Sequence, residues 1–220
     1  YSFKFDEKKW GVEWKKVKLP HDWVVDLPFA KEASHSHGYK QVGFKYPETS
    51  VGWYRKLFNV SKEDFGKHIY LQFDGIFRDA RVWVNGFYLG HEPSGYAAQI
   101  YDISEYLNYG EENLVAVRAD ATLEEGWFYE GAGIYRHVWL NKVSPLHVVP
   151  FGTFVYAEMK APFEQAELTI ETTVQNHGLK TADYLLTHVL LDAEGKEIAR
   201  CQAPGTQVLP KAKDQTLTRM

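Results

Sequence analysis

The dipeptide Asn85-Gly86 constrains what this chain can fold into more than any other short feature. Apolar runs flank it, at 81–84 and at 87–90. Both residues of an Asn-Gly pair tolerate positive φ, and a two-residue hairpin turn requires that conformation. The sequence therefore predicts an antiparallel β-hairpin whose strands cover 81–84 and 87–90.

The rest of the first 143 residues also follows the period of a β-strand. Ile69, Leu71 and Phe73 alternate with His68, Tyr70 and Gln72, which is typical of a half-buried strand. A helical turn is expected only at 104–107. The other segments expected as strands are 51–60, 100–103, 113–120 and 134–143. Short strands at regular spacing, with turn residues between them, indicate a sandwich or a jelly roll.

The composition changes near Ser144-Pro145, since no Trp occurs beyond Trp139. Strand-like alternation continues at 146–156, 168–174, 184–191 and 196–201. We therefore expect an all-β chain with two domains, a jelly-roll sandwich over 1–144 and an immunoglobulin-like β-sandwich over 145–220. The second domain offers about 75 residues, whereas such a sandwich needs about 100. We expect it to be incomplete at its C-terminus, with an unpaired strand edge.

The composition excludes several classes of function. Hydrophobic residues make up 45% of the chain, which supports a packed core. The net charge is -4 without a long basic run, so no nucleic acid is expected as a partner. No apolar stretch reaches the roughly 20 residues of a membrane span, so no membrane is expected either. The only cysteine is Cys201, which excludes an internal disulfide and a Cys-based metal site.

The chain begins at Tyr1 without an initiator Met or a signal peptide, and we expect it to be processed or trimmed. Its localisation stays open.

Several motifs occur together and in a fixed order. They are Leu19-Pro20-His21-Asp22-Trp23, Gly52-Trp53-Tyr54-Arg55-Lys56, Ala80-Arg81-Val82-Trp83-Val84-Asn85-Gly86, Tyr101-Asp102-Ile103-Ser104 and Tyr129-Glu130-Gly131-Ala132-Gly133-Ile134-Tyr135-Arg136. The ordered set resembles the N-terminal domain of glycoside hydrolase family two, and within it the bacterial β-galactosidases. The resemblance covers 1–144 and continues more weakly through the second domain.

The resemblance implies a retaining exo-glycosidase that hydrolyses terminal β-galactosides. In the family, the jelly roll and the sandwich lead into a (β/α)₈ barrel that carries two catalytic Glu residues. Such a barrel needs roughly 250 residues, and none follow Met220. We therefore expect no catalytic residue and no cofactor in this chain, whose partners would be the β-linked sugar and the missing barrel. β-Glucuronidase and β-mannosidase activities also occur in the family, and a homo-oligomer stays open.

The resemblance also implies that the loop over 120–129 reaches the sugar pocket with an acidic residue. A carboxylate can accept hydrogen bonds from two vicinal hydroxyls. Glu125 is the nearest acidic residue to the family position, Glu124 is the second, and Trp127 falls at the position itself. These three are the substrate-binding candidates, and a solvated loop is the alternative. Two family contacts are missing, an Arg from the run at 126–129 and an Asn that Gly43 replaces.

Other candidate sites are weaker. The carboxylates at 111–112 and 124–125 are adjacent in sequence, and neighbours on a strand point to opposite faces, which argues against a facing catalytic pair. His35 and His37 suggest a metal site, but zinc sites generally need three or four ligands and no third lies nearby in sequence. We expect a polar surface loop there and no metal. We expect His21 and Asp22 to tie down a loop.

Two other function classes compete with the glycosidase. A self-sufficient carbohydrate-binding module would present an aromatic platform on an exposed sheet face or a loop rim. The aromatic content of 15% suits sugar stacking, although β-sandwich cores also use such rings. A structural domain pair would serve only oligomer contacts. Fold alone does not decide among the three.

Overall fold

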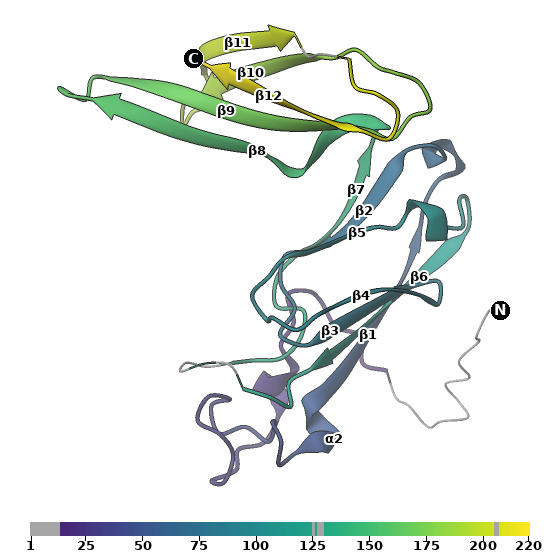
Figure 1. Cartoon of the computed structure of the whole chain (residues 1–220). Helices are drawn as coiled ribbons and strands as arrows, with labels where there is room; N and C mark the ends of the chain where they lie inside the picture. The colour runs from purple at the N-terminus through teal and green to yellow at the C-terminus, as the bar shows by residue number, and fades with distance from the viewer. Residues whose placement is uncertain (1–13, 125, 127–129, 205–206) are drawn as a thin grey trace. The chain divides into compact units, whose positions relative to one another are not determined.

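The computed structural model describes residues 14–124, 126, 130–204 and 207–220. The chain divides into two compact units, 1–142 and 143–220. The first consists of strands with short helical turns, and the elements described in the second are all strands (Figure 1). The predicted fold class, an all-β jelly-roll sandwich followed by an immunoglobulin-like sandwich, is confirmed. No helix in the described ranges has the length and apolarity that crossing a membrane would take.

The first unit contains two sheets. One has the strand order β1-β6-β3-β4, and the other has the order β5-β2-β7. The bounds are β1 (Val51–Asn59), β6 (Glu112–Asp120), β3 (Ala80–Val84), β4 (Phe87–Glu92), β5 (Gln99–Asp102), β2 (His68–Phe73) and β7 (Val138–Val143). The predicted hairpin is β3–β4, and Asn85 and Gly86 both have positive φ in its turn.

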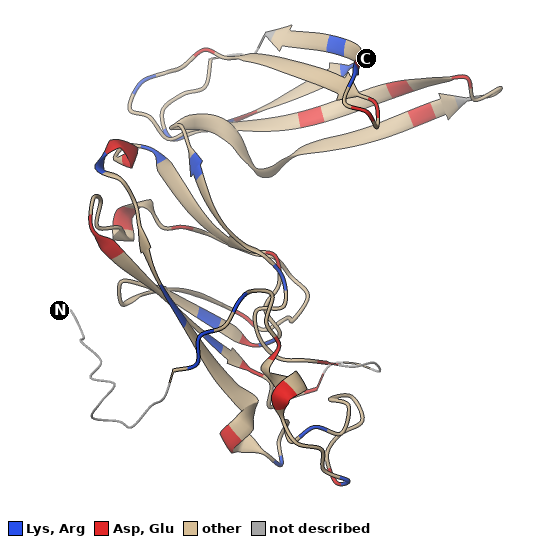
Figure 2. Cartoon of the chain, turned by 180° about the vertical axis from the view of Figure 1, so that it is seen from behind, with Lys and Arg blue, Asp and Glu red and all other residues tan. Residues whose placement is uncertain are grey.

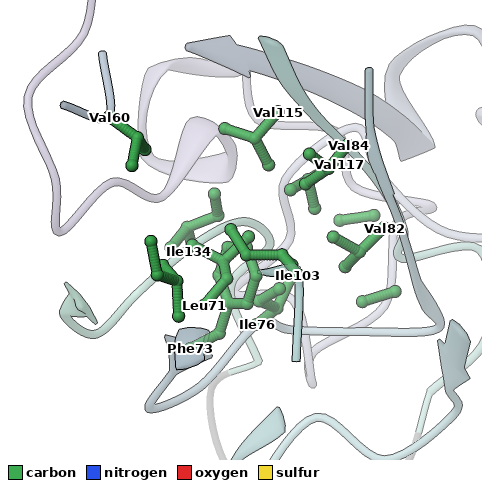
Figure 3. Packing of buried hydrophobic residues seen from close by; sticks show 13 residues of the cluster. Val60, Leu71, Phe73, Ile76, Val82, Val84, Ile103, Val115, Val117 and Ile134 are labelled. Carbon is green, nitrogen blue, oxygen red and sulfur yellow. The ribbon is translucent and has the colours of Figure 1, made fainter. Parts of the chain in front are cut away.

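The core of this unit lies where the inward faces of the strands meet. Along β6, Val115, Val117 and Ala119 are buried, whereas Leu114 and Ala116 face outward and are at least partly exposed. The cluster also includes Phe73 of β2 (Figure 3). Burial of each large apolar side chain contributes roughly 1.5–3 kcal/mol to folding. Period-two alternation is thus the feature of the sequence that builds the sandwich.

Short helical segments connect the strands of the first unit. They are η1 (Trp23–Asp26), α2 (Pro47–Ser50), η2 (Lys62–Asp64) and η3 (Ser104–Tyr106). The last of these is the helical turn predicted at 104–107. A second, smaller core of Val24, Val42, Ala121 and Ala132 holds the loops around η1 together.

The second unit contains a sheet of order β12-β9-β8 and the hairpin β10-β11. The bounds are β8 (Leu146–Lys160), β9 (Gln165–Asn176), β10 (Leu185–Leu191), β11 (Glu197–Pro204) and β12 (Lys213–Arg219). Ile170, Thr172 and Val174 of β9 are buried, as their alternation predicts. At the end of β9 the buried Asn176 donates from Nδ2 to the carbonyls of Lys180 and Val208, which fixes the following turn.

Candidate functional site

Three loop segments meet in the first unit, and Asp22 joins two of them. Its Oδ1 accepts hydrogen bonds from the backbone N–H of Val24 and of Ala132, both at 2.9 Å. The first bond caps η1, and the second fixes the loop that precedes β7. A Cβ at Gly131 would collide with the Asp22 carboxylate, so only glycine fits there. The expectation that Asp22 ties down a loop is confirmed.

The turn around Ser36 and His37 anchors the same loop from another side. The backbone N–H of Glu130 donates to the carbonyl of Ser36 at 2.6 Å, and Ser36 Oγ donates to the carbonyl of Gly126 at 3.1 Å. His37 Nδ1 lies 2.8 Å from the carbonyl of Glu130. A carbonyl can only accept, so Nδ1 carries a hydrogen and donates it. Nε2 has no hydrogen-bond partner among the described residues.

The prediction of a polar surface loop at 35–37 is therefore wrong for two of its three residues. His35 is exposed, but Ser36 and His37 have relative exposures of 2% and 0%. Hydrogen bonds from Ser36 Oγ and His37 Nδ1 to backbone carbonyls near residue 130 offset part of the cost of this burial. The two imidazoles lie in different environments and do not act as a pair.

Segment 43–50 supports the start of the loop. The buried Ser50 donates from Oγ to the carbonyl of Gly43 at 3.0 Å, and its own carbonyl accepts from Ala121 N–H at 2.8 Å. A Cβ built on Gly43 would lie 3.9 Å from the carbonyl oxygen of Thr122. The structure thus brings the position where the family has Asn next to the loop that carries the predicted acidic residues.

The first turn of the loop is fixed by Asp120. Its Oδ1 accepts from the backbone N–H of Thr122 at 3.0 Å and from its hydroxyl at 2.5 Å. Burial opposes ionisation of Asp120, but the bonds from Thr122 and Arg118 outweigh it and hold the pKa of this carboxyl below its usual value. The loop therefore begins, at the end of β6, with a turn that the charged Asp120 carboxylate holds in place.

Glu124 follows this turn and is exposed. An exposed carboxylate on an anchored loop can accept hydrogen bonds from the hydroxyls of a ligand. The other two candidates, Glu125 and Trp127, lie outside the described residues. Sequence reasoning missed Glu130 and His37 as buried polar residues, because nothing in the sequence distinguishes them from exposed loop residues.

A groove of about 440 Å³ opens between the two sheets of the first unit, beside β1 and β7. Its lining is mostly apolar and includes Phe58, Leu71, Val117 and Leu140. Tyr54 also lines it, and burial raises the pKa of this phenol, whose oxygen lies 2.8 Å from His21 Nδ1. Among the described residues, the lining of the groove includes neither Glu124 nor another carboxylate.

Comparison with known proteins agrees with this architecture. A beta-galactosidase of Bacteroides ovatus is 39% identical over 194 residues, which are 88% of this chain and 22% of that protein. A putative beta-glucuronidase of Formosa agariphila is 36% identical over 192 residues, 84% of this chain and 17% of that protein. The crystal structure of a glycosyl hydrolase family 2 member from Bacteroides cellulosilyticus superposes with a TM-score of 0.83 at 30% identity, covering 98% of this chain and 27% of that one.

The chain thus spans about a fifth of the length of these curated relatives. Residues 13–144 match the family described as "Glycosyl hydrolases family 2, sugar binding domain", and this match covers more than half of the chain. The chain therefore belongs to glycosyl hydrolase family 2.

Proposed function

We propose that this chain is the N-terminal, non-catalytic part of a retaining exo-glycosidase that hydrolyses terminal β-galactosides. The observation that carries the proposal is the anchored loop after β6, which presents an exposed carboxylate at Glu124. Similarity to the beta-galactosidase of Bacteroides ovatus supports the choice of sugar.

In this proposal the loop shapes one wall of the sugar pocket. Glu124 and Glu125 accept hydrogen bonds from sugar hydroxyls, and Trp127 lines the edge of the pocket. Retaining hydrolysis needs two carboxyl groups about 5–5.5 Å apart, an acid/base and a nucleophile. Both come from a barrel domain of the longer protein, which is the partner of this chain.

The first experiment compares the 220-residue chain with the longer protein in the hydrolysis of nitrophenyl β-galactoside and nitrophenyl β-glucuronide. Only the longer protein is expected to be active, and the galactoside is expected to be its better substrate. Turnover by the 220-residue chain alone would overturn the assignment of catalysis to another domain. Preference for the glucuronide would overturn the choice of sugar.

The second experiment tests the loop itself. In the longer protein, Glu124→Gln and Glu125→Gln are compared with Glu111→Gln, an exposed carboxylate at the other end of β6. A hydrogen bond to a charged group contributes about 1.5–3 kcal/mol, so loss of a sugar contact is expected to raise KM about tenfold or more. Glu111→Gln is expected to change nothing. Unchanged KM in both loop variants would mean that these two carboxylates face solvent and do not contact the sugar.

A further inference from the structure

The outward face of the sheet β1-β6-β3-β4 carries a row of aromatic side chains. Trp53 of β1 and Trp83 of β3 stack with ring centroids 5.4 Å apart, and Tyr88 of β4 continues the row 5.5 Å from Trp83. The relative exposures of Trp53 and Tyr88 are 50% and 53%. We call Trp53, Trp83 and Tyr88 the aromatic row.

The strand register explains why the rings meet. β6 places Ala116 opposite Trp83 and Arg118 opposite Trp53, so the two indoles meet diagonally across β6, beside the small side chain of Ala116. Trp83 lies in turn opposite Tyr88. The row therefore runs across the sheet from β1 to β4.

Two guanidinium groups flank the aromatic row. Arg118 of β6 and Arg81 of β3 lie directly opposite each other on the same outward face, and like charges in such a pair are destabilising. Arg118 is paired with Asp120 at 2.8 Å, and Arg81 lies 3.5 Å from Asp79. Figure 2 shows basic residues in blue on the strands of the first unit. We call Arg81 and Arg118 the arginine pair.

This combination points to a ligand that is both flat and acidic. The aromatic row offers exposed ring surface for the apolar C–H face of a pyranose. The arginine pair offers planar donors whose geometry matches a carboxylate, and an anion between them would offset their mutual repulsion. A protein interface is a poorer match, because interface centres are depleted of charge and this pair lies in the middle of the face.

We propose that the outward face of the sheet β1-β6-β3-β4 binds a β-linked polysaccharide chain that carries uronate residues. The sugar rings stack along the aromatic row, and a uronate carboxylate bonds to the arginine pair. Residues 13–144, which include this face, match a sugar binding domain by its family description. The inference does not depend on the proposed glycosidase, since it involves neither the loop at Glu124 nor a catalytic group.

Affinity electrophoresis of the 220-residue chain tests the proposal. The gels contain glucuronoxylan, which carries uronate, or β-1,4-galactan, which is neutral. Glucuronoxylan is expected to retard the chain more strongly than galactan, and added salt is expected to weaken this retardation because exposed charges are screened. No retardation by either polysaccharide would overturn the proposal, and equal retardation by both would overturn the role of the uronate.

Variants separate the rings from the charges. Trp53→Ala with Tyr88→Ala is expected to lower the affinity about tenfold. Trp53→Leu keeps apolar area but removes the ring, so it is expected to lose affinity as well. Arg81→Gln is expected to reduce binding of glucuronoxylan and leave that of galactan unchanged. Circular dichroism checks that each variant keeps its strands.

Two controls complete the design. Phe65→Ala removes an aromatic side chain that is 79% exposed and lies outside the row, and Glu111→Gln removes an exposed carboxylate outside both the row and the loop. Both are expected to bind glucuronoxylan like the original chain. Equal loss in Phe65→Ala would overturn the assignment to this face. Light scattering checks the oligomeric state. If the chain is a dimer and the double variant Trp53→Ala with Tyr88→Ala is a monomer, the face binds a second copy of the chain and not a polysaccharide.

Discussion

His37 is a buried imidazole with one nitrogen bonded and the other not. His37→Asn keeps an N–H donor near the position of Nδ1, whereas His37→Phe keeps the ring shape and loses the donor. The phenylalanine variant removes the donor to the carbonyl of Glu130, and loss of a buried hydrogen bond costs about 1–3 kcal/mol. We expect His37→Phe to lower the free energy of unfolding in urea more than His37→Asn does. Equal losses would mean that the bond to Glu130 does not anchor the loop.

The sequence predicts the positions of the site residues better than their environments. Glu124 is expected on the loop after 120 and is exposed there, because it follows the last residues of a strand that alternation identifies, whereas its contact with a sugar stays a prediction. Burial of His37 and Ser36 depends on a backbone segment more than 90 residues away along the chain. No local pattern encodes such a pairing, so a short polar segment is interpreted as surface.

Elements with a local signal are predicted well, and those defined by long-range pairing are not. The β3–β4 hairpin follows from Asn85-Gly86 alone, since both residues adopt the required positive φ. β8 runs to Lys160, beyond the expected end at 156, because it continues to pair with β9. The helix η2 has no periodic signal in the sequence, which predicts a helical turn only at 104–107. Only the contacts of Asp64 show that η2 connects to β7.

Asp64 connects η2 to β7. Its carboxylate accepts from Lys142 Nζ at 2.6 Å and from Lys67 Nζ at 2.9 Å, and these bonds, first that of Lys142, lower its pKa to about 2. A folded-state pKa below the unfolded value of about 3.9 stabilises the fold above that pH. This contribution is lost as the pH falls from about 4 to about 2.

Asp64→Asn is therefore expected to make the thermal midpoint of the first unit less dependent on pH between about 4 and 2. The original chain should lose stability over that range more steeply than the variant. The exposed neighbour Glu63 provides the matched control, Glu63→Gln, which is expected to keep the steep dependence. Parallel pH profiles for the original chain and Asp64→Asn would show that the hydrogen bonds of Asp64 to Lys142 and Lys67 do not stabilise the fold in solution.

Over the whole molecule, composition predicts the division into two units. All seven Trp residues precede residue 140, and the structure divides after residue 142. Aromatic-rich strands build the jelly roll, whereas the second unit relies on shorter apolar residues and on buried polar groups such as Asn176 and Thr172. The pairing order within each sheet does not follow from composition, because it depends on contacts between strands distant in sequence.

The distribution of Trp also allows the stability of each unit to be measured separately, because tryptophan fluorescence reports the first unit and circular dichroism reports the strands of both. Asn176→Ala removes the two hydrogen bonds from Nδ2 to the carbonyls of Lys180 and Val208, at a cost of about 2 kcal/mol. We expect the circular-dichroism transition of the second unit to fall by about 8 °C or more, while the fluorescence midpoint stays unchanged. Gln175→Ala, a half-buried neighbour on the same strand, is the control. A matching fall in fluorescence would mean that the two units unfold as one cooperative structure.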